Sequence, residues 1–197
     1  MKPLARAFFD RPAEVVAKDL LGAMIVSTIG GCRTSGVIVE TEAYLGFDDP
    51  ASHAYRGRRH AGNLNLYAPP GPWYVYLSYG IHWCANLVTG NPAAGAAVLL
   101  RAVVPQEGVP VMRRRRGKAP DRHLADGPGK LCQALGITRR EDGLLMSRSA
   151  LRVGLVGESP AGGIVATPRV GITKAADWPL RFLRTTGSAS GGRARGD

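Results

Sequence analysis

Two glutamates separated by one residue, Glu40 and Glu42, are the side chains best suited to acid–base chemistry in this chain. They end an apolar run at 36–39 that is typical of a strand, and alternate residues of a strand face the same side. A carboxylate among apolar groups resists ionisation, whereas a nearby cation favours the charged form. Such a group can take a proton from water, and Arg101, the charged residue within the apolar run 97–104, is a candidate partner. The alternative is that both glutamates lie exposed at a sheet edge and discourage aggregation.

Aromatic residues gather in one part of the chain. Nine of the thirteen aromatic side chains, including all six tyrosines, lie between residues 44 and 83. The same stretch holds the basic or imidazole side chains of His53, Arg56, Arg58, Arg59 and His60. Interleaved basic and aromatic side chains are typical of surfaces that hold phosphates and stack on nucleobases. The alternative is a core rich in tyrosine and tryptophan.

Two other kinds of site find little support. Cys32, Cys84 and Cys132 lack the Cys-x-x-Cys or His-x-x-x-His spacing of metal sites, so we expect buried thiols and no metal. The GPGK run at 127–130 resembles part of a phosphate-binding loop, but Leu124 stands where a Walker A motif needs its first glycine. This run opens a predicted helix, so its free N–H groups and Lys130 could still bind a backbone phosphate.

The charge balance indicates a polyanionic partner. The chain carries 26 Lys+Arg, of which 21 are arginine, against 15 Asp+Glu, a formal net charge of +11. Arginine has a planar fork that suits phosphate oxygens and base edges. Nucleic acid is favoured over a membrane because no segment combines a basic face with a long apolar stripe. The alternative is charge that serves solubility alone, and the arginine run at 113–116 is more typical of a solvated face.

The remaining pattern predicts a single α+β domain over 1–184, with a curved, mainly antiparallel sheet and surrounding helices. Asp10 is predicted to cap a helix at 12–21. Strands are expected at 23–26 and 36–42, joined through Gly30-Gly31, at 73–78 and 82–88 around Tyr79-Gly80, and at 97–104. Helices at 107–116 and 129–135 and short strands at 151–156 and 164–171 complete the core.

Two segments fall outside these elements. The stretch 46–71 is too long for an ordinary connection, which indicates a functional loop. The basic, Gly/Ser-rich tail 185–197 cannot bury enough apolar area to offset chain entropy, so we expect disorder there. The N-terminus lacks an apolar signal core and the three cysteines are scattered, which favours an intracellular location, and no membrane partner is expected.

Several spaced motifs resemble the alkyladenine (3-methyladenine) DNA glycosylase family. In order along the chain they are ETEAYLG at 40–46, His53, YVYLSYGIH at 74–82, CAN at 84–86, VLLRA at 98–102, GPGKLCQAL at 127–135 and PRVGI at 168–172. The similarity extends over nearly all of residues 4–183. The resemblance implies a monomeric, cofactor-free enzyme that flips alkylated purines out of double-stranded DNA and hydrolyses the N-glycosidic bond.

The resemblance also implies roles for individual residues. Glu42 matches the catalytic base, which activates a water that attacks C1′ of the deoxyribose. Arg101 matches an arginine that contacts DNA and supports the catalytic carboxylate. Tyr44 and His53 match one wall of the base pocket and Tyr76 the other, with the damaged base stacked between them.

Further matches concern the duplex. Asn86 matches an asparagine that clashes with the exocyclic amine of ordinary guanine. Tyr79 matches the tyrosine that enters the minor groove and fills the gap left by the flipped nucleotide, and Ile81 beside it would contact the duplex. Expected contacts with the DNA backbone come from Lys130, Arg56 and Arg58.

The matching pocket holds no lysine nucleophile, so no Schiff-base lyase step is expected. Excision of 3-methyladenine and 7-methylguanine is the expected activity, while hypoxanthine and ethenoadenine remain open. Two rival hypotheses belong to other classes. One is a non-catalytic nucleic-acid-binding module that stacks bases on its tyrosines. The other is a metal-dependent nuclease built on the carboxylates Glu40, Glu42, Asp48 and Asp49.

Overall fold

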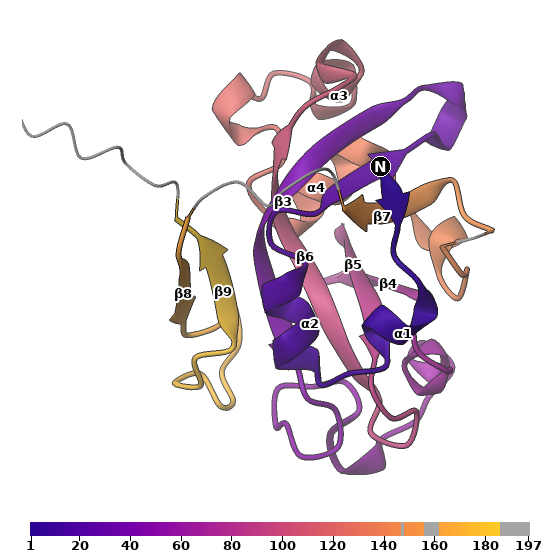
Figure 1. The fold of residues 1–197 in the computed structure, drawn as a ribbon, viewed down its shortest axis with the longest axis vertical. Coiled ribbons are helices and arrows are strands. Elements are labelled where there is room, and N and C mark those ends of the chain that lie inside the picture. Colours follow the sequence, from indigo (N-terminus) through magenta and orange to yellow (C-terminus); the bar gives the residue numbers. More distant parts are fainter. Residues whose placement is uncertain (147, 156–161, 186–197) are drawn as a thin grey trace, which may run out of the picture.

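The computed structural model describes residues 1–146, 148–155 and 162–185, which form an α+β fold around one curled antiparallel sheet (Figure 1). The described strands are β1 (Lys2–Pro3), β2 (Met24–Ser27), β3 (Thr34–Tyr44), β4 (Trp73–Ser78), β5 (His82–Thr89), β6 (Ala96–Pro105), β7 (Leu151–Leu155), β8 (Ile164–Thr167) and β9 (Arg181–Arg184). The described α-helices are α1 (Arg6–Phe9), α2 (Ala13–Asp19), α3 (Val109–Arg116) and α4 (Pro128–Leu135). This arrangement confirms the predicted fold class.

The long strand β3 organises the sheet. The strand order is β1-β7-β2-β3-β6-β5-β4, and every pairing is antiparallel. One edge of β3 pairs with β6, while the other is shared: β2 pairs with its first residues, and β9 pairs with Glu40, Thr41 and Glu42. The β8–β9 hairpin stands out at the side of the molecule (Figure 1). Glu42 therefore has a paired strand on each side and does not lie at an exposed edge of the sheet.

One face of the sheet packs into the main hydrophobic core. Alternate residues of four neighbouring strands point into it, and we call this side the core face; its members are Ala43 of β3, Val98 and Leu100 of β6, Ala85 and Leu87 of β5, and Trp73 and Val75 of β4. Apolar residues of α1, α2, α3 and α4 join the same buried cluster. Because strand residues alternate in direction, the intervening residues of these strands face the other side.

Local chain geometry explains several boundaries. Gly30 and Gly31 both adopt positive φ in the turn between β2 and β3, as predicted for that pair of glycines. Gly136 ends α4 with a left-handed φ of 76°. The predicted capping by Asp10 is wrong: the N-cap of α2 is Pro12, and no side-chain hydrogen bond caps this helix. Asp10 instead ends α1, because its own N–H bonds to the carbonyl of Arg6.

Near the C-terminus, the predicted strand at 164–171 is too long. Strand β8 ends at Thr167 and is largely exposed, so it does not complete the core. Pro168 has no N–H to donate to a ladder, and the segment 168–172 leaves the sheet and turns back towards β3. Strand β9 was not predicted, since its four residues show no alternation.

Thr185, the residue after the predicted domain end at 184, bonds to the carbonyl of Gly163 through its N–H and its hydroxyl. The rest of the predicted tail, 186–197, lies outside the described residues, as does position 156 of the predicted strand 151–156. None of the helices that the structure describes has the length and apolar character needed to cross a lipid bilayer.

Candidate active site

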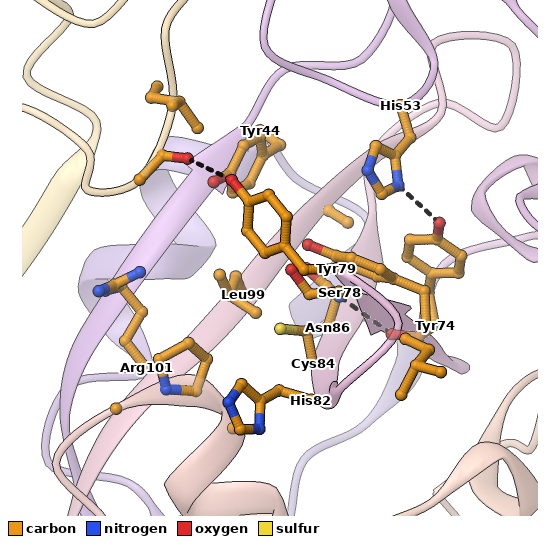
Figure 2. Close-up of a pocket in the computed structure, with 18 of the residues that line it drawn as sticks. Tyr44, His53, Tyr74, Ser78, Tyr79, His82, Cys84, Asn86, Leu99 and Arg101 are labelled. Carbon is orange, nitrogen blue, oxygen red and sulfur yellow. Dashed lines mark hydrogen bonds between the residues drawn. The ribbon is translucent and has the colours of Figure 1, made fainter.

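The side of the sheet opposite the core lines a cavity of about 810 Å³. We call this side the cavity face; its lining residues are Tyr44 of β3, Ala97 and Leu99 of β6, Cys84 and Asn86 of β5, and Tyr74, Tyr76 and Ser78 of β4. Figure 2 shows the labelled members of this set pointing into one space, with His53 above it and Arg101 at its side. Residues 170–172 and the first turn of α4 line the remaining sides.

Glu42 lies directly behind this lining and is 0% exposed. Its Oε2 accepts a hydrogen bond from the hydroxyl of Tyr44 at 2.9 Å, and its Oε1 accepts one from the N–H of Val170 at 2.8 Å. The Nη1 of Arg101 lies 3.3 Å from the same Oε1. Each oxygen of a carboxylate offers about two lone-pair positions, and each hydrogen bond uses one of them. The guanidinium of Arg101 lies beside Oε1, so a position on Oε2 is left. All three groups that hold the carboxylate belong to residues that line the cavity.

Arg101 contacts both glutamates, as the sequence predicted. Its Nε donates to Oε1 of Glu40 at 2.8 Å, and Nη1 of Arg181 lies 3.2 Å from the same oxygen. The register between β3 and β6 shifts around Glu40, so Arg101 has no direct partner on β3. Such irregularities re-aim side chains and often lie beside active sites. Here the shift brings a guanidinium from an apolar strand to the carboxylates.

Charge and burial fix the protonation of the groups around Glu42. Burial alone would lower the pKa of Arg101, but the charge of Glu42 and the hydrogen bond to Glu40 raise that pKa overall, so the guanidinium stays charged. Burial and the negative charge of Glu42 raise the pKa of Tyr44 well above its ordinary value. Tyr44 therefore keeps its proton and remains a donor to the carboxylate.

The aromatic walls meet at one side of the cavity. The ring of Tyr76 stacks on Tyr74 with centroids 5.4 Å apart, and Nδ1 of His53 lies 2.8 Å from the hydroxyl of Tyr74. The rings of His53 and Tyr76 touch edge to face, with centroids 4.5 Å apart. A base stacked between two rings needs them about 7 Å apart, twice the usual contact distance. In this conformation no base fits between His53 and Tyr76.

Asn86 and His53 are held in defined orientations. The Nδ2 of Asn86 donates to the backbone carbonyl of Tyr74 at 3.1 Å, which fixes this buried amide beside Leu99 on the cavity floor (Figure 2). Desolvation lowers the pKa of His53, and its neighbours His60 and Arg58 lower it further. His53 is therefore neutral above its ordinary pKa of 6.5.

The β4–β5 hairpin carries two exposed apolar side chains at its tip. Tyr79 is 86% exposed and Ile81 is 71% exposed. Tyr79 and Gly80 are the central residues of a turn closed by the bond from the N–H of Ile81 to the carbonyl of Ser78, and both have positive φ, 50° and 69°. Positive φ is rare for residues other than glycine, and above all for bulky ones, so the backbone conformation of Tyr79 is unusual. The hydroxyl of Tyr79 donates to the carbonyl of Gly171 at 3.4 Å, so the ring leans over the cavity mouth (Figure 2).

The three residues expected to contact the DNA backbone lie on two segments. Lys130, in the first turn of α4, lines the cavity. Its Nζ lies 2.9 Å from Asp126. Arg56 and Arg58 are exposed on the 46–71 loop and do not line the cavity.

The carboxylates of the nuclease hypothesis are separated by their partners. Asp49 is fully buried and paired with Arg169, while Glu40 and Glu42 share Arg101. Within 1–146, 148–155 and 162–185, no three His, Cys, Asp or Glu side chains come close enough together to hold a metal ion. Cys84 and Cys132 are buried as expected, whereas Cys32 is only partly buried.

Sequence reasoning gave no role to Tyr74, Arg169 or Val170, and it considered Asp49 only as a carboxylate of the nuclease hypothesis. Tyr74 could have been found from its spacing, because it precedes Tyr76 by two residues in the same strand. The contacts of the other three residues join segments more than 100 residues apart, and no local pattern reports such a contact.

An aromatic-walled cavity beside a buried carboxylate, held by two hydrogen bonds and an ion pair with Arg101, defines a candidate hydrolase site on an antiparallel α+β fold. Residues 7–187 match the family model described as methylpurine-DNA glycosylase (MPG). The chain is 47% identical over 182 residues to a protein of Nitrobacter winogradskyi, covering 92% of this chain and 83% of the relative. It is 48% identical over 186 residues to one of Methanoculleus marisnigri, covering 91% of this chain and 93% of the relative. Each relative bears the name "Putative 3-methyladenine DNA glycosylase".

The chain therefore belongs to the methylpurine-DNA glycosylase family. Membership confirms the resemblance drawn from the motifs and makes the protein a DNA glycosylase, a hydrolase of N-glycosyl bonds.

Proposed function

We propose that this protein flips alkylated purines, 3-methyladenine and 7-methylguanine first among them, out of duplex DNA and hydrolyses their N-glycosidic bond. The observation that carries the proposal is the arrangement of Glu42. Hydrogen bonds from Tyr44 and Val170 and the guanidinium of Arg101, all from the cavity lining, hold its carboxylate and leave a lone pair on Oε2. That lone pair accepts a proton from water as the water attacks C1′ of the everted nucleotide.

The chemistry needs little else from the protein. An alkylated purine such as 3-methyladenine carries positive charge and leaves readily, so a base for water matters more than an acid for the leaving group. The developing charge on the sugar is stabilised by the carboxylates nearby, with which Arg101 forms ion pairs. No covalent intermediate is proposed, because Lys130, the cavity lysine, lies at the α4 end and is paired with Asp126.

Base recognition follows from the walls of the cavity. Tyrosine faces attract cations by roughly 0.5–2 kcal/mol, more when water is excluded, so Tyr44 and Tyr76 favour charged purines. The ring of His53 is in contact with the ring of Tyr76 in the absence of DNA. A base can therefore stack between Tyr44 and Tyr76 only when His53 turns away from Tyr76. The fixed amide of Asn86 on the floor then disfavours a guanine that carries its exocyclic amine.

Extrusion of the base falls to the hairpin tip. Flipping a nucleotide costs a few kcal/mol, less at a damaged base that pairs or stacks poorly. Tyr79 and Ile81 are apolar, exposed and held on a tight turn, which suits a wedge that fills the gap in the duplex. Insertion requires Tyr79 to leave Gly171, and a 3.4 Å hydrogen bond at an exposed position offers little resistance.

The remaining expected contacts concern the phosphates. Lys130 at the α4 end of the cavity and Arg56 and Arg58 on the 46–71 loop would hold the DNA backbone. The net charge of +11 predicts binding that weakens steeply with salt. We propose that the protein acts as a monomer on double-stranded DNA inside the cell.

The test is release of free base from duplex DNA treated with a methylating agent, with and without chelator and borohydride. We expect release of 3-methyladenine and 7-methylguanine that chelator does not affect, and no borohydride-trapped protein–DNA adduct. Binding without release would instead favour the non-catalytic module. Strand cleavage that chelator abolishes would favour the nuclease, and a trapped adduct would show a covalent step.

A further inference from the structure

The segment 168–172 resembles the family but received no role from the sequence, and its Arg169 is buried in the protein. The side chains of Arg169 and Asp49 are both 0% exposed. Nη1 donates to Oδ2 of Asp49 at 2.5 Å and Nη2 donates to Oδ1 at 2.9 Å, a bidentate pair. Nη1 also donates to the backbone carbonyl of Ala43 in β3 at 3.0 Å. One guanidinium thus joins three separate parts of the chain.

The two hydrogen-bond donors to Glu42, Tyr44 and Val170, both depend directly on Arg169. Val170, the next residue, gives its N–H to Oε1 of Glu42 at 2.8 Å. The guanidinium lies 4.7 Å from the ring centroid of Tyr44, whose hydroxyl donates to Oε2. A shift of Arg169 would therefore move the donors on both oxygens of the carboxylate.

Asp49 extends the same connection to the aromatic wall. Its Oδ2 also accepts from the N–H of Leu45 at 3.1 Å, and its Oδ1 accepts from the N–H of Ala51 at 3.0 Å. These bonds shape the turn that leads to His53. The pair therefore fixes the loop that carries one cavity wall relative to the segment that carries Val170.

Stability alone is a weak reason for such a pair. Removing two charges from water is costly, and replacing a buried ion pair with apolar residues is often neutral or stabilising. A bidentate pair fixes direction as well as distance. Here the groups whose direction it fixes are the donors that orient Glu42.

We propose that Arg169, held by Asp49, is a positioning residue that aims the free lone pair of Glu42 at the cavity through Val170 and Tyr44. This inference rests on the proposed role of Glu42 as the base. Arg169 does not touch the reacting atoms, so its loss should slow the chemical step without weakening DNA binding.

The test compares Arg169→Lys and Asp49→Asn with wild type under single-turnover conditions. Lysine keeps the charge but cannot form the bidentate pair. We expect the excision rate on methylated duplex to fall roughly 10- to 100-fold, the effect of a misaimed group, with unchanged affinity for a duplex holding an uncleavable abasic analogue. In both variants the amide proton of Val170 should shift upfield in NMR spectra, because its bond to Glu42 lengthens.

Two control variants separate positioning from general effects. Val153→Ala removes methyl groups from the core on β7 and does not touch the cavity, so it should lower the melting temperature and leave the rate and the Val170 amide unchanged. Arg33→Gln removes one positive charge just before β3, next to the exposed Glu107, and controls for net charge.

The possible outcomes are distinct. If wild type releases no base, the proposed function fails. If wild type is active and Glu42→Gln is not, but Arg169→Lys matches wild type in rate and in the Val170 amide shift, only the positioning role fails. The positioning role is also overturned if the excision rate of Arg169→Lys falls no further than that of Val153→Ala for the same loss of melting temperature. Should Arg169→Lys fail to fold, Asp49→Asn, which keeps one acceptor for the guanidinium, decides by the same criteria.

Discussion

Leu99 and Leu100 are neighbours in β6, yet they face two different environments. Leu100 lies on the core face among apolar side chains, whereas Leu99 lies on the cavity face beside Asn86 (Figure 2). The core face is filled by apolar residues that need only shape and volume to fit. The cavity face carries tyrosines, an asparagine and charged groups held by specific hydrogen bonds. Strand alternation thus separates the residues that stabilise the fold from those that do chemistry.

The sharpest way to break this comparison is to shorten each leucine in turn. Leu100→Ala should cost about 2–5 kcal/mol of the free energy of unfolding, because it leaves a cavity in a packed core. Urea unfolding measures that loss, and single-turnover excision well below the melting temperature should be unchanged. Leu99→Ala should cost less stability, since its side chain borders open space, but it should change the relative rates on different lesions. Equal losses of stability in both variants would contradict the division between the faces.

A second test concerns the ring of Tyr76 on the cavity face. Tyr76→Ala should weaken binding to lesion-containing duplex by roughly 1–3 kcal/mol, the usual contribution of an aromatic side chain that stacks on a base. Tyr76→Phe keeps the ring and is the matched control, so its affinity should stay near that of wild type. Fluorescence anisotropy with lesion and undamaged duplexes measures both. An alanine variant that binds lesions like wild type would remove Tyr76 from the proposed wall.

The alternation behind this comparison could be predicted from the sequence. Glu40 and Glu42 are two residues apart on a predicted strand, and Arg101 stands out as a charge within an apolar strand. Tyr79-Gly80 falls between two alternating segments, which placed the hairpin tip correctly. Local periodicity is enough for such features, because each depends on residues close together in the chain.

The contacts that aim the carboxylate could not be predicted in this way. The N–H of Val170 reaches Glu42 across 128 residues, and Arg169 reaches Asp49 across 120. The apolar residues of 164–171 favoured a strand, but the buried ion pair and Pro168 take residues 168–172 out of the sheet. The contact between His53 and Tyr76 was equally hidden, since it depends on how the 46–71 loop folds over β4.

The smallest expected effect is the pH dependence of stability that comes from the cavity wall. The pKa of His53 is lower in the folded protein than its ordinary value of 6.5. The unfolded chain therefore binds the proton first as pH falls, so stability is full above about pH 6.5 and decreases as pH falls below it. His53→Gln should reduce the difference in the free energy of unfolding between pH 7.5 and 5.5. An equal pH difference in variant and wild type would show that His53 does not contribute.

The most direct test of the central claim compares the two glutamates that share Arg101. Glu42→Gln and Glu40→Gln each remove one charge from the same face of β3, but only Glu42 is held by Tyr44 and Val170. We predict that Glu42→Gln binds lesion duplex normally and loses at least about 100-fold in single-turnover excision, the low end for a positioned base. Glu40→Gln should lose clearly less. Equal losses in the two variants, or normal excision by Glu42→Gln, would contradict the assignment of Glu42 as the base.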